Sequence, residues 1–258
     1  MRVLRMAAAA VAVLAVVGGA EAKDWSKVRI GTEGAYPPFN SLTADGQLIG
    51  FDVDIAKALC EEMKVECEFV TQDWDGMIPA LQAGKFDAVI ASMSITEERK
   101  QKVDFTNKYY NTPPAIAVPK DSAIAGTSDA DLKGVALGAQ SSTTHSNYAE
   151  EKLGSADLKL YPTPDEYKLD VASGRIDAVI DDVVVLSDWL ATDDGACCKI
   201  LGTLTPDPVI NGEGAGIAIR KDDGELKEMF NQAIEAILAN GKYQEINDKY
   251  FTFDVYGG

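Results

Sequence analysis

Short apolar runs rich in β-branched residues alternate along the chain with stretches of amphipathic, helical period. The pattern predicts strands at 28–31, 68–71, 87–91, 115–118, 135–138, 158–161, 178–180 and 216–220. It predicts helices at 53–63, at 77–83, from about Thr96, and at about 224–239 and 243–250, with further helices between the strands of the middle part. Strands that alternate with helices are typical of α/β layers.

One segment of this pattern occurs twice. The sequence G-K-F-D-A-V-I at 84–90 recurs as G-R-I-D-A-V-I at 174–180, each time after a short predicted helix and leading into an apolar strand. A repeat so far apart is too long for a solenoid and suits two similar lobes. The alternative is that it is only a common helix-to-strand connection. Because ligands of open α/β sheets bind beyond the carboxyl ends of the strands, the repeat predicts a cleft with Ser92 and Asp182 at equivalent strand ends.

The first residues predict a leader rather than a part of the fold. Arg2 and Arg5 precede an apolar run at 6–17, and Ala20-Glu21-Ala22 has the A-x-A form of a cleavage site. The alternative, a membrane anchor, needs about 20 apolar residues, and this run is shorter. We therefore predict a signal peptide at 1–22, and a mature chain that is exported, soluble and periplasmic.

Charge and cysteine content limit the possible partners. The formal net charge of −17 opposes binding to phosphate backbones, so we expect no nucleic acid, although charge alone decides nothing about a small ligand. Cys60 and Cys67 are spaced for a local bridge, whereas the neighbouring Cys197 and Cys198 either form a vicinal disulfide or stay reduced. With one histidine and no CxxC spacing, a zinc site is disfavoured, and we expect no metal and no cofactor.

Donors for a carboxylate follow the first strand end. A free amino acid needs such donors for its carboxylate and acceptors for its ammonium. Thr96 is a predicted helix N-cap, which leaves backbone amides free, and Ser94 lies just before it. Arg99, one turn into this helix, can bind a carboxylate through two parallel hydrogen bonds. The alternative pairs Arg99 with Glu97 or Glu98 at the surface.

The second lobe offers a matching segment. Gln140-Ser141-Ser142-Thr143-Thr144 precedes another predicted helix, so Ser142 and Thr143 can present hydroxyls and amides, unless the segment is an ordinary N-cap. Asp182 can accept from an ammonium group. We expect Asp181 to be solvated or to cap the next helix, and His145 to be a solvent-facing helix residue.

Two aromatic residues and a glutamate complete the candidate site. Glu33 and Tyr36 follow the first strand, and Trp74 lies just past another strand. The two rings can enclose a side chain and attract a cation, at about 0.5–2 kcal/mol each. The alternative for either ring is packing between the lobes.

Several motifs in one order carry a resemblance that covers nearly all of the mature chain. They are R-I-G-T at 29–32, G-F-D-V-D-I-A at 50–56, S-M-S-I-T at 92–96, G-R-I-D-A at 174–178 and Y-F-T-F-D-V-Y-G-G at 250–258. With them the chain resembles the periplasmic lysine/arginine/ornithine- and histidine-binding proteins of ABC importers, in the bacterial extracellular solute-binding protein family 3.

The resemblance implies a two-lobed α/β fold of the periplasmic-binding type (type II). Each lobe would have a mostly parallel sheet flanked by helices, with lobe 1 at 23–111 and 210–258, lobe 2 at 112–209 and two hinge crossovers. It also implies the Cys60–Cys67 disulfide. The implied partners are a free amino acid, most often a cationic one, and a membrane permease, with the receptor acting as a monomer and not as an enzyme.

The resemblance further assigns residue roles. Arg99 and Thr143 would hold the ligand carboxylate, Ser92, Ser94 and Asp182 its ammonium, and Glu33 its distal cation, with Tyr36 and Trp74 flanking the side chain. Three features depart from the family: Ala91 in place of serine, Glu33 in place of aspartate, and the 193–199 segment with Cys197-Cys198. Alternative readings are an opine, glutamine or another polar amino acid as ligand, or an enzyme similar to a periplasmic cyclohexadienyl dehydratase.

Overall fold

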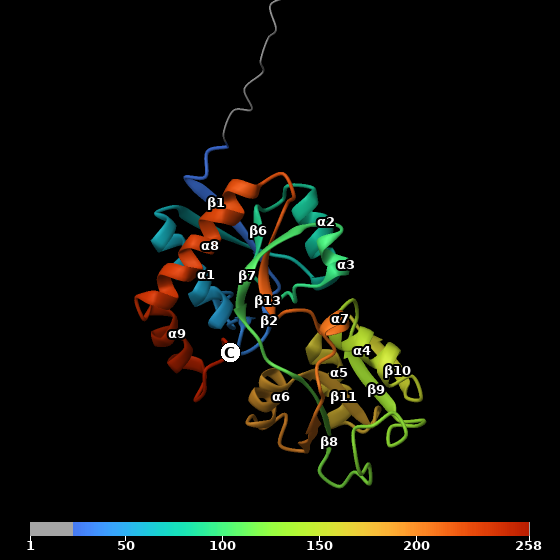
Figure 1. Cartoon of the computed structure of the whole chain (residues 1–258). Coiled ribbons are helices and arrows are strands. Elements are labelled where there is room, and N and C mark those ends of the chain that lie inside the picture. The colour runs from blue at the N-terminus through green and yellow to red at the C-terminus, as the bar shows by residue number, and fades with distance from the viewer. Residues whose placement is uncertain (1–22, 258) are drawn as a thin grey trace, which may run out of the picture.

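The computed structural model describes residues 23–257, so the predicted leader lies outside the described residues. The chain forms two lobes, each built on a five-stranded sheet with helices packed around it (Figure 1). Within the described part of the chain, no helix combines the length and the apolar character needed to cross a membrane.

The sheet of the first lobe has the strand order β5-β1-β6-β13-β7. Its strands are β1 (Lys27–Thr32), β5 (Glu66–Thr71), β6 (Ala88–Val89), β7 (Asp104–Tyr110) and β13 (Ala215–Ile219). β5, β1 and β6 are mutually parallel, and β13 is antiparallel to both of its neighbours, β6 and β7. Only β13 is therefore antiparallel to the other strands, and the sheet is mostly parallel, as expected.

The sheet of the second lobe repeats this arrangement in the order β10-β9-β11-β8-β12. Its strands are β8 (Pro114–Pro119), β9 (Ala136–Gln140), β10 (Asp157–Tyr161), β11 (Ala178–Asp182) and β12 (Cys198–Thr203). Here β8 is the strand of opposite direction. The two-lobed α/β architecture expected from the sequence is confirmed.

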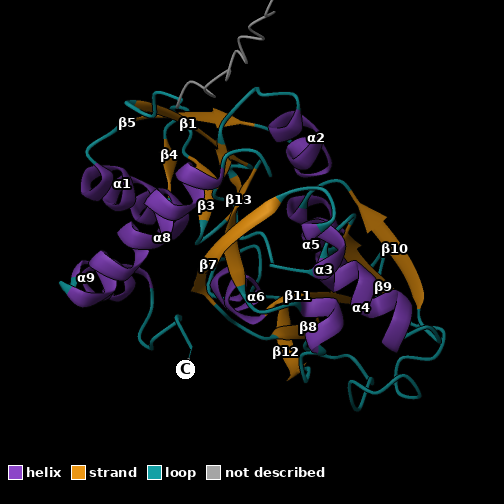
Figure 2. Ribbon diagram, turned by 45° about the horizontal axis from the view of Figure 1, so that its top comes forward, coloured by secondary structure: helices purple, strands orange, loops and turns teal. Residues whose placement is uncertain are grey.

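Helices cover both sheets (Figure 2). The first lobe carries α1 (Phe51–Met63), the short 3-10 helix η1 (Trp74–Gly76), α2 (Met77–Gln82), α3 (Glu97–Lys100), α8 (Gly224–Ala239) and α9 (Lys242–Tyr250). The second lobe carries α4 (Thr144–Lys152), α5 (Pro164–Ala172), α6 (Val183–Leu190) and α7 (Pro208–Asn211). A small antiparallel sheet of β2 (Ala35–Tyr36), β3 (Asn40–Leu42) and β4 (Leu48–Ile49) adjoins the first lobe.

The repeated motif has the same local structure in both lobes. Gly84 and Gly174 each adopt a φ of 73°, which glycine reaches without the steric cost of a Cβ. After them, Asp87 and Asp177 lie just before β6 and β11, and these two strands pair in parallel with β1 and β9. The predicted equivalence of the strand ends at Ser92 and Asp182 therefore agrees with the topology.

The chain passes from the first sheet to the second at residues 111–113, and returns between β12 and β13, where α7 lies. β7 and β12 have no counterpart among the strands predicted from the sequence. Both are edge strands with several polar or half-exposed residues, so neither shows the apolar run of a central strand. The exact lobe boundaries at 111/112 and 209/210 stay predictions.

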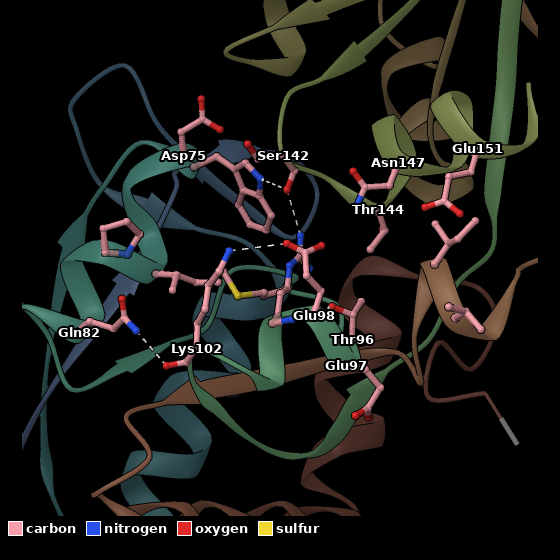
Figure 3. A pocket seen from close by; sticks show the side chains of 17 residues that line it. Asp75, Gln82, Thr96, Glu97, Glu98, Lys102, Ser142, Thr144, Asn147 and Glu151 are labelled. Carbon is pink, nitrogen blue, oxygen red and sulfur yellow. Dashed lines mark hydrogen bonds and ion pairs between the residues drawn. The ribbon is translucent and has the colours of Figure 1, made fainter. Parts of the chain in front are cut away.

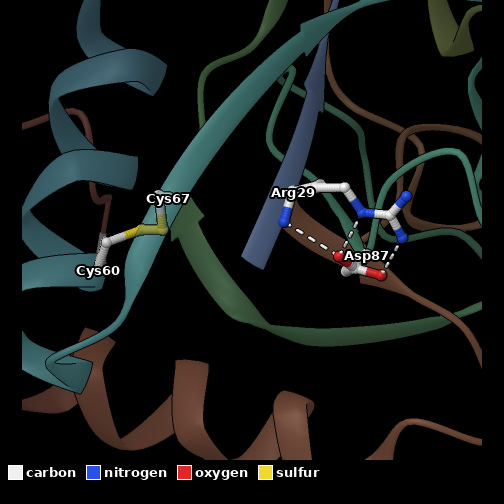
Figure 4. Close-up of a disulfide and its surroundings, with 4 residues drawn as sticks. All are labelled: Arg29, Cys60, Cys67 and Asp87. Atoms are coloured by element: carbon white, nitrogen blue, oxygen red, sulfur yellow. Dashed lines mark hydrogen bonds and ion pairs between the residues drawn. A yellow bond between two sulfur atoms is a disulfide. The ribbon is translucent and has the colours of Figure 1, made fainter. Parts of the chain in front are cut away.

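The two cysteine pairs differ. A disulfide joins Cys60 of α1 to Cys67 of β5, as expected (Figure 4). Cys197 and Cys198 are free thiols, the first exposed and the second buried at the start of β12. The carbonyl of Cys197 accepts a hydrogen bond from the amide of Lys120, which holds this peptide in the strand pairing with β8.

Candidate functional site

The cleft between the lobes holds two adjoining cavities. The inner cavity is lined by Glu33, Tyr36, Trp74, Ala91, Ser92, Ser94 and Arg99 of the first lobe and by Gln140, Thr143, Thr144 and His145 of the second. The hinge cavity shares Tyr36, Ser92, Ser94, Thr144 and His145 with it and extends to Thr112 and Asp182. The carboxyl ends of β1, β6, β9 and β11 therefore meet at one site. This agrees with the strand-end rule, by which ligands of open α/β sheets bind beyond the carboxyl ends of the strands.

An outer groove opens beside the inner cavity, between α2 and α3 of the first lobe and α4 and α7 of the second (Figure 3). Trp74 and Arg99 line both the groove and the inner cavity. The indole Nε1–H of Trp74 donates to the carbonyl of Ser142 at 3.1 Å, and Nη2 of Arg99 donates to the same carbonyl at 3.1 Å. Two donors of the first lobe thus share one acceptor of the second.

Arg99 is the cationic group of the inner cavity. Its side chain is buried, lies 5.3 Å from the centre of the Trp74 ring, and donates to the carbonyls of Ser94 and Ser142. The alternative pairing with Glu97 or Glu98 is wrong, because the guanidinium points inward to these carbonyls. Burial lowers the pKa of Arg99 to about 10, so the group is a cation at neutral pH and can bind a carboxylate.

Thr143 is the N-cap of α4, so the alternative interpretation of the 140–144 segment as an ordinary N-cap holds for this residue. Its hydroxyl accepts from the amide of Ser146 at 3.0 Å and donates to the carbonyl of Gln140 at 2.8 Å. The hydroxyl is therefore occupied by the helix end. The amides of Thr143 and Ser146 are bonded in the capping box, so the amides of Thr144 and His145 are the donors that can face an anion. Ser142 contributes its carbonyl to the cleft, while its side chain belongs to the outer groove.

Hydroxyl groups lie between the two cavities. Ser94 Oγ lies 3.5 Å from Thr144 Oγ1 across the cleft. Ser92, with a φ of 56°, donates its Oγ–H to the buried carboxyl of Asp52 at 2.9 Å, and its backbone amide donates to the hydroxyl oxygen of Tyr109 at 3.0 Å. These groups can accept from or donate to a polar ligand in either cavity.

Asp182 lies in the hinge cavity, not in the inner one. Its carboxyl caps α6 by accepting from the amide of Val184 at 2.7 Å, and it accepts from the hydroxyl of Thr112. Burial raises the pKa of Asp182 to about 7 in spite of these bonds. A ligand ammonium that reached Asp182 would stabilise its ionised form.

The expectation that Asp181 is solvated or caps the helix is wrong. Asp181 is buried, and Asp182 caps α6 in its place. The Asp181 carboxylate accepts from the hydroxyl of Tyr36 at 2.6 Å, from the hydroxyl of Tyr167 and from the amide of Asp182. The parallel strand β11 points alternate side chains to opposite faces, and the face of Asp181 is covered by α4 and α5.

The expectation that His145 faces solvent is also wrong. Only 16% of its side chain is exposed, and its Nδ1 lies 3.2 Å from Oδ1 of Asp181. His145 lines both cavities. His145 is the second residue of α4, and the N-terminus of this helix is directed at the cleft. The imidazole therefore points inward.

Glu33 lines the inner cavity and not the hinge cavity, where Asp182 lies. Its carboxyl accepts from the side-chain amide of Gln140 at 2.6 Å, across the cleft. Burial raises the pKa of Glu33 to about 7, and the bond from Gln140 opposes this shift. Tyr36 is buried with its hydroxyl on Asp181, and Trp74 is half-buried, so both rings line the cavity and also connect the lobes.

Four residues that line or support the cavity were missed as site residues. They are Gln140, Thr144, His145 and Asp181. Gln140 and Thr144 were noted in the sequence only as neighbours of Ser142 and Thr143, and Asp181 only as a neighbour of Asp182. The strand-end rule, applied to every residue of 140–145 and not only to the expected ones, would have found the first three.

The fold and site define a two-lobed binding protein, with its ligand site in the cleft between two mostly parallel sheets. The family model of the bacterial extracellular solute-binding proteins, family 3, matches residues 28–253. The chain belongs to this family.

Two curated relatives and a solved structure extend the comparison. The chain is 53% identical over 233 residues to the L-arginine-binding protein of Pseudomonas aeruginosa, covering 89% of this chain and 90% of the relative. It is 40% identical to the histidine-binding periplasmic protein of Salmonella typhimurium, covering 90% of each chain. An ancestral arginine-binding protein bound to arginine superposes with a TM-score of 0.81 at 38% identity, over 88% of this chain and 98% of that chain. These relatives are named as binding proteins, and the chain is a solute-binding protein rather than an enzyme.

Proposed function

We propose that this protein is the periplasmic receptor of an ABC importer and captures a free cationic L-amino acid, with arginine as the first candidate. One observation carries the proposal: a single cleft contains a buried guanidinium, Arg99, and two carboxyls, Glu33 and Asp182, and none of the three forms an ion pair within residues 23–257. A ligand with one carboxylate and two cationic groups would complement all three.

The proposed pose follows from this arrangement. The ligand carboxylate binds Arg99 and the amides of Thr144 and His145, which follow the N-cap Thr143, because the amides of Thr143 and Ser146 are held in the capping box. The ligand ammonium contacts Ser92, Ser94 and Asp182, and the distal guanidinium or ammonium contacts Glu33. Tyr36 and Trp74 flank the aliphatic part of the side chain, and the carbonyl of Ser142 fixes Arg99 and Trp74.

The names of the relatives support this choice of ligand. Both an L-arginine-binding and a histidine-binding protein are similar over nine-tenths of the chain. We further propose that residues 1–22 are removed on export, that the mature receptor is a monomer, and that the lobes, bounded near 111/112 and 209/210, close on the ligand and then dock on the membrane permease.

Calorimetric titration of the mature chain with the twenty amino acids and ornithine tests the proposal. We expect arginine to bind with a Kd below about 10 μM, which corresponds to about 7 kcal/mol. Agmatine, which lacks only the carboxylate of arginine, is the matched control ligand and should bind at least about a hundredfold more weakly, because it leaves the buried Arg99 without an anion. If arginine, lysine, ornithine and histidine all fail to bind at this level, the assignment is wrong.

A further inference from the structure

His145 and Asp181 form a pair that the proposed ligand contacts leave unused. They lie on α4 and β11 of the second lobe, and the imidazole forms part of the wall of both cavities. His145 is the only histidine in the chain. Its second ring nitrogen, Nε2, has no hydrogen-bond partner within residues 23–257, whereas Nδ1 faces Asp181 at 3.2 Å.

The hydrogen bonds of Asp181 decide where the proton of His145 lies. The hydroxyls of Tyr36 and Tyr167 and the amide of Asp182 converge on this carboxylate. Because these three donors already point at the Asp181 carboxyl, its oxygens act as acceptors, and the 3.2 Å approach of Nδ1 favours the tautomer that carries the proton on Nδ1. The buried position of Asp181, with 3% of the residue exposed, keeps water from replacing this contact.

The charged surroundings keep the ring neutral. Burial lowers the pKa of His145, and the cation of Arg99 on α3 lowers it further, while Asp181 raises it without reversing the net direction. Lys168 of α5 and Glu33 of the first lobe also lie in this electrostatic environment. A neutral imidazole with a proton on Nδ1 has a free lone pair on Nε2.

We infer that Asp181 is a positioning residue that holds His145 as the Nδ1–H tautomer, so that Nε2 accepts a hydrogen bond from the ligand. This inference rests on the proposed function for the identity of the ligand, but not for the state of the ring. A cationic amino acid carries many N–H donors and few acceptors, so an extra neutral acceptor in the wall favours it. The opposite tautomer would present an N–H to those donors and disfavour binding.

The same carboxylate ties this acceptor to the other lobe. Tyr36 comes from the first lobe, and its hydroxyl lies 2.6 Å from Oδ1, the oxygen that His145 also approaches. Asp181 therefore receives a donor of the first lobe on the atom that orients the imidazole. Closure of the cleft and orientation of His145 are linked through this one oxygen.

Nitrogen-15 NMR of the chain labelled only at histidine tests the inference, because one histidine gives one pair of ring signals. At pH 7.5 we expect Nδ1 to be protonated and Nε2 to be unprotonated, and the Nε2 signal to shift on addition of arginine. Asp181→Asn should convert the ring to a mixture of tautomers and weaken arginine binding about tenfold. Tyr167→Phe is the matched control: it removes another donor from the same carboxylate and should leave the tautomer unchanged.

A second pair of variants separates the acceptor from the packing of the ring. His145→Asn retains an acceptor and should keep most of the affinity, while His145→Leu has none and should lose at least about tenfold. An Nε2–H tautomer in the wild type, or equal affinities of the two variants, would overturn the inference. If calorimetry detects no arginine binding although the Nδ1–H tautomer is present, the proposed ligand is wrong and the positioning role of Asp181 stands. If arginine binds and the Nε2 signal does not move, the acceptor role is wrong and the proposed function stands.

Discussion

The two lobes approach the cleft through the same turn and strand. Gly84 and Gly174 share a φ of 73°, and the aspartate three residues later bonds the neighbouring parallel strand in the same way in both lobes. Asp87 donates its amide to the carbonyl of Arg29 and accepts from the amide of the same residue, and Asp177 does both with Ala136. The ion pairs distinguish them. Asp87 also binds the guanidinium group of Arg29 (Figure 4) and that of Arg220, whereas Asp177 is exposed.

Past the strands the lobes differ completely. The first lobe ends in Ser92, a neutral residue in the left-handed region, followed by the segment that carries Arg99. The second ends in Asp181 and Asp182, two buried carboxyls, the second of which begins α6 directly. The repeated motif thus sets the position of the strand end, and the segment after it, up to Arg99 in the first lobe and Asp181-Asp182 in the second, sets which charge each lobe offers to a ligand.

The largest expected effect on stability comes from replacing the equivalent aspartate of each lobe, Asp87 or Asp177. Asp87→Ala should lower the free energy of unfolding by about 2–3 kcal/mol, because it removes the carboxylate that two guanidinium groups and a backbone amide share. Asp177→Ala removes only one backbone acceptor at an exposed position and should cost about 1 kcal/mol or less. Urea titration of the two ligand-free variants measures both. Equal losses of unfolding free energy in the two variants would mean that the ion pairs of Asp87 do not contribute to stability.

The next largest effect is expected on ligand affinity, from substitutions at the strand-end residues Ser92 and Asp182. Asp182→Asn should weaken arginine binding by about 1.5–3 kcal/mol, since it removes the charge that faces the ligand ammonium in the proposed pose. Asparagine also caps helices well, so α6 should stay intact. Ser92→Ala should cost about 1 kcal/mol or less, because its hydroxyl is already bonded to Asp52 at 2.9 Å.

Calorimetry at pH 8 compares these two variants with the wild type. The melting temperature of each ligand-free variant serves as the control for folding. A loss for Ser92→Ala as large as that for Asp182→Asn would contradict the division of roles between the strand ends.

The local pattern of the sequence was sufficient to predict the central strands and the part of the site that lies at the strand ends and helix starts. The apolar runs predicted β1, β9 and β11, and the N-cap Thr96 predicted the start of α3. The polar segment 140–144 was expected to precede a helix, and α4 follows it. The repeat predicted equivalent positions for Ser92 and Asp182. These features depend on neighbours within a few residues, which the sequence displays directly.

The contacts across the cleft could not be predicted in the same way. Asp181 is buried because Tyr36, 145 residues away, and Tyr167 donate to it, and His145 is turned inward by the orientation of α4. A buried carboxylate and a solvated one look alike in a sequence, because the donors that make burial tolerable come from distant segments. The edge strands β7 and β12 were not predicted for a related reason. Each becomes a strand by pairing with a neighbour that is distant in the sequence, β13 or β8.

The smallest expected effect is a pH dependence that separates Glu33 of the first lobe from Asp182 of the second. Burial raises the pKa of each to about 7. A cationic ligand favours the ionised carboxylates, so it lowers both pKa values, and binding below pH 7 must release protons. Affinity for arginine should therefore fall with falling pH, by up to about 1.4 kcal/mol per pH unit for each group that is protonated in the free protein. His145, whose pKa is lowered, stays neutral between pH 7 and 8 and contributes only under more acidic conditions.

Calorimetry at pH 6.5 and pH 8 in buffers of different ionisation enthalpy counts the released protons. The wild type should release protons at pH 6.5 and almost none at pH 8. Glu33→Gln and Asp182→Asn should each remove part of the release, and the double variant nearly all of it. Glu33→Gln retains the size of the side chain and its bond to Gln140 through the amide oxygen, so its effect reports the charge rather than the packing. If Glu33→Gln leaves the proton release unchanged, the ligand cation does not contact the first lobe at this position, and the second lobe alone supplies the negative charge of the site.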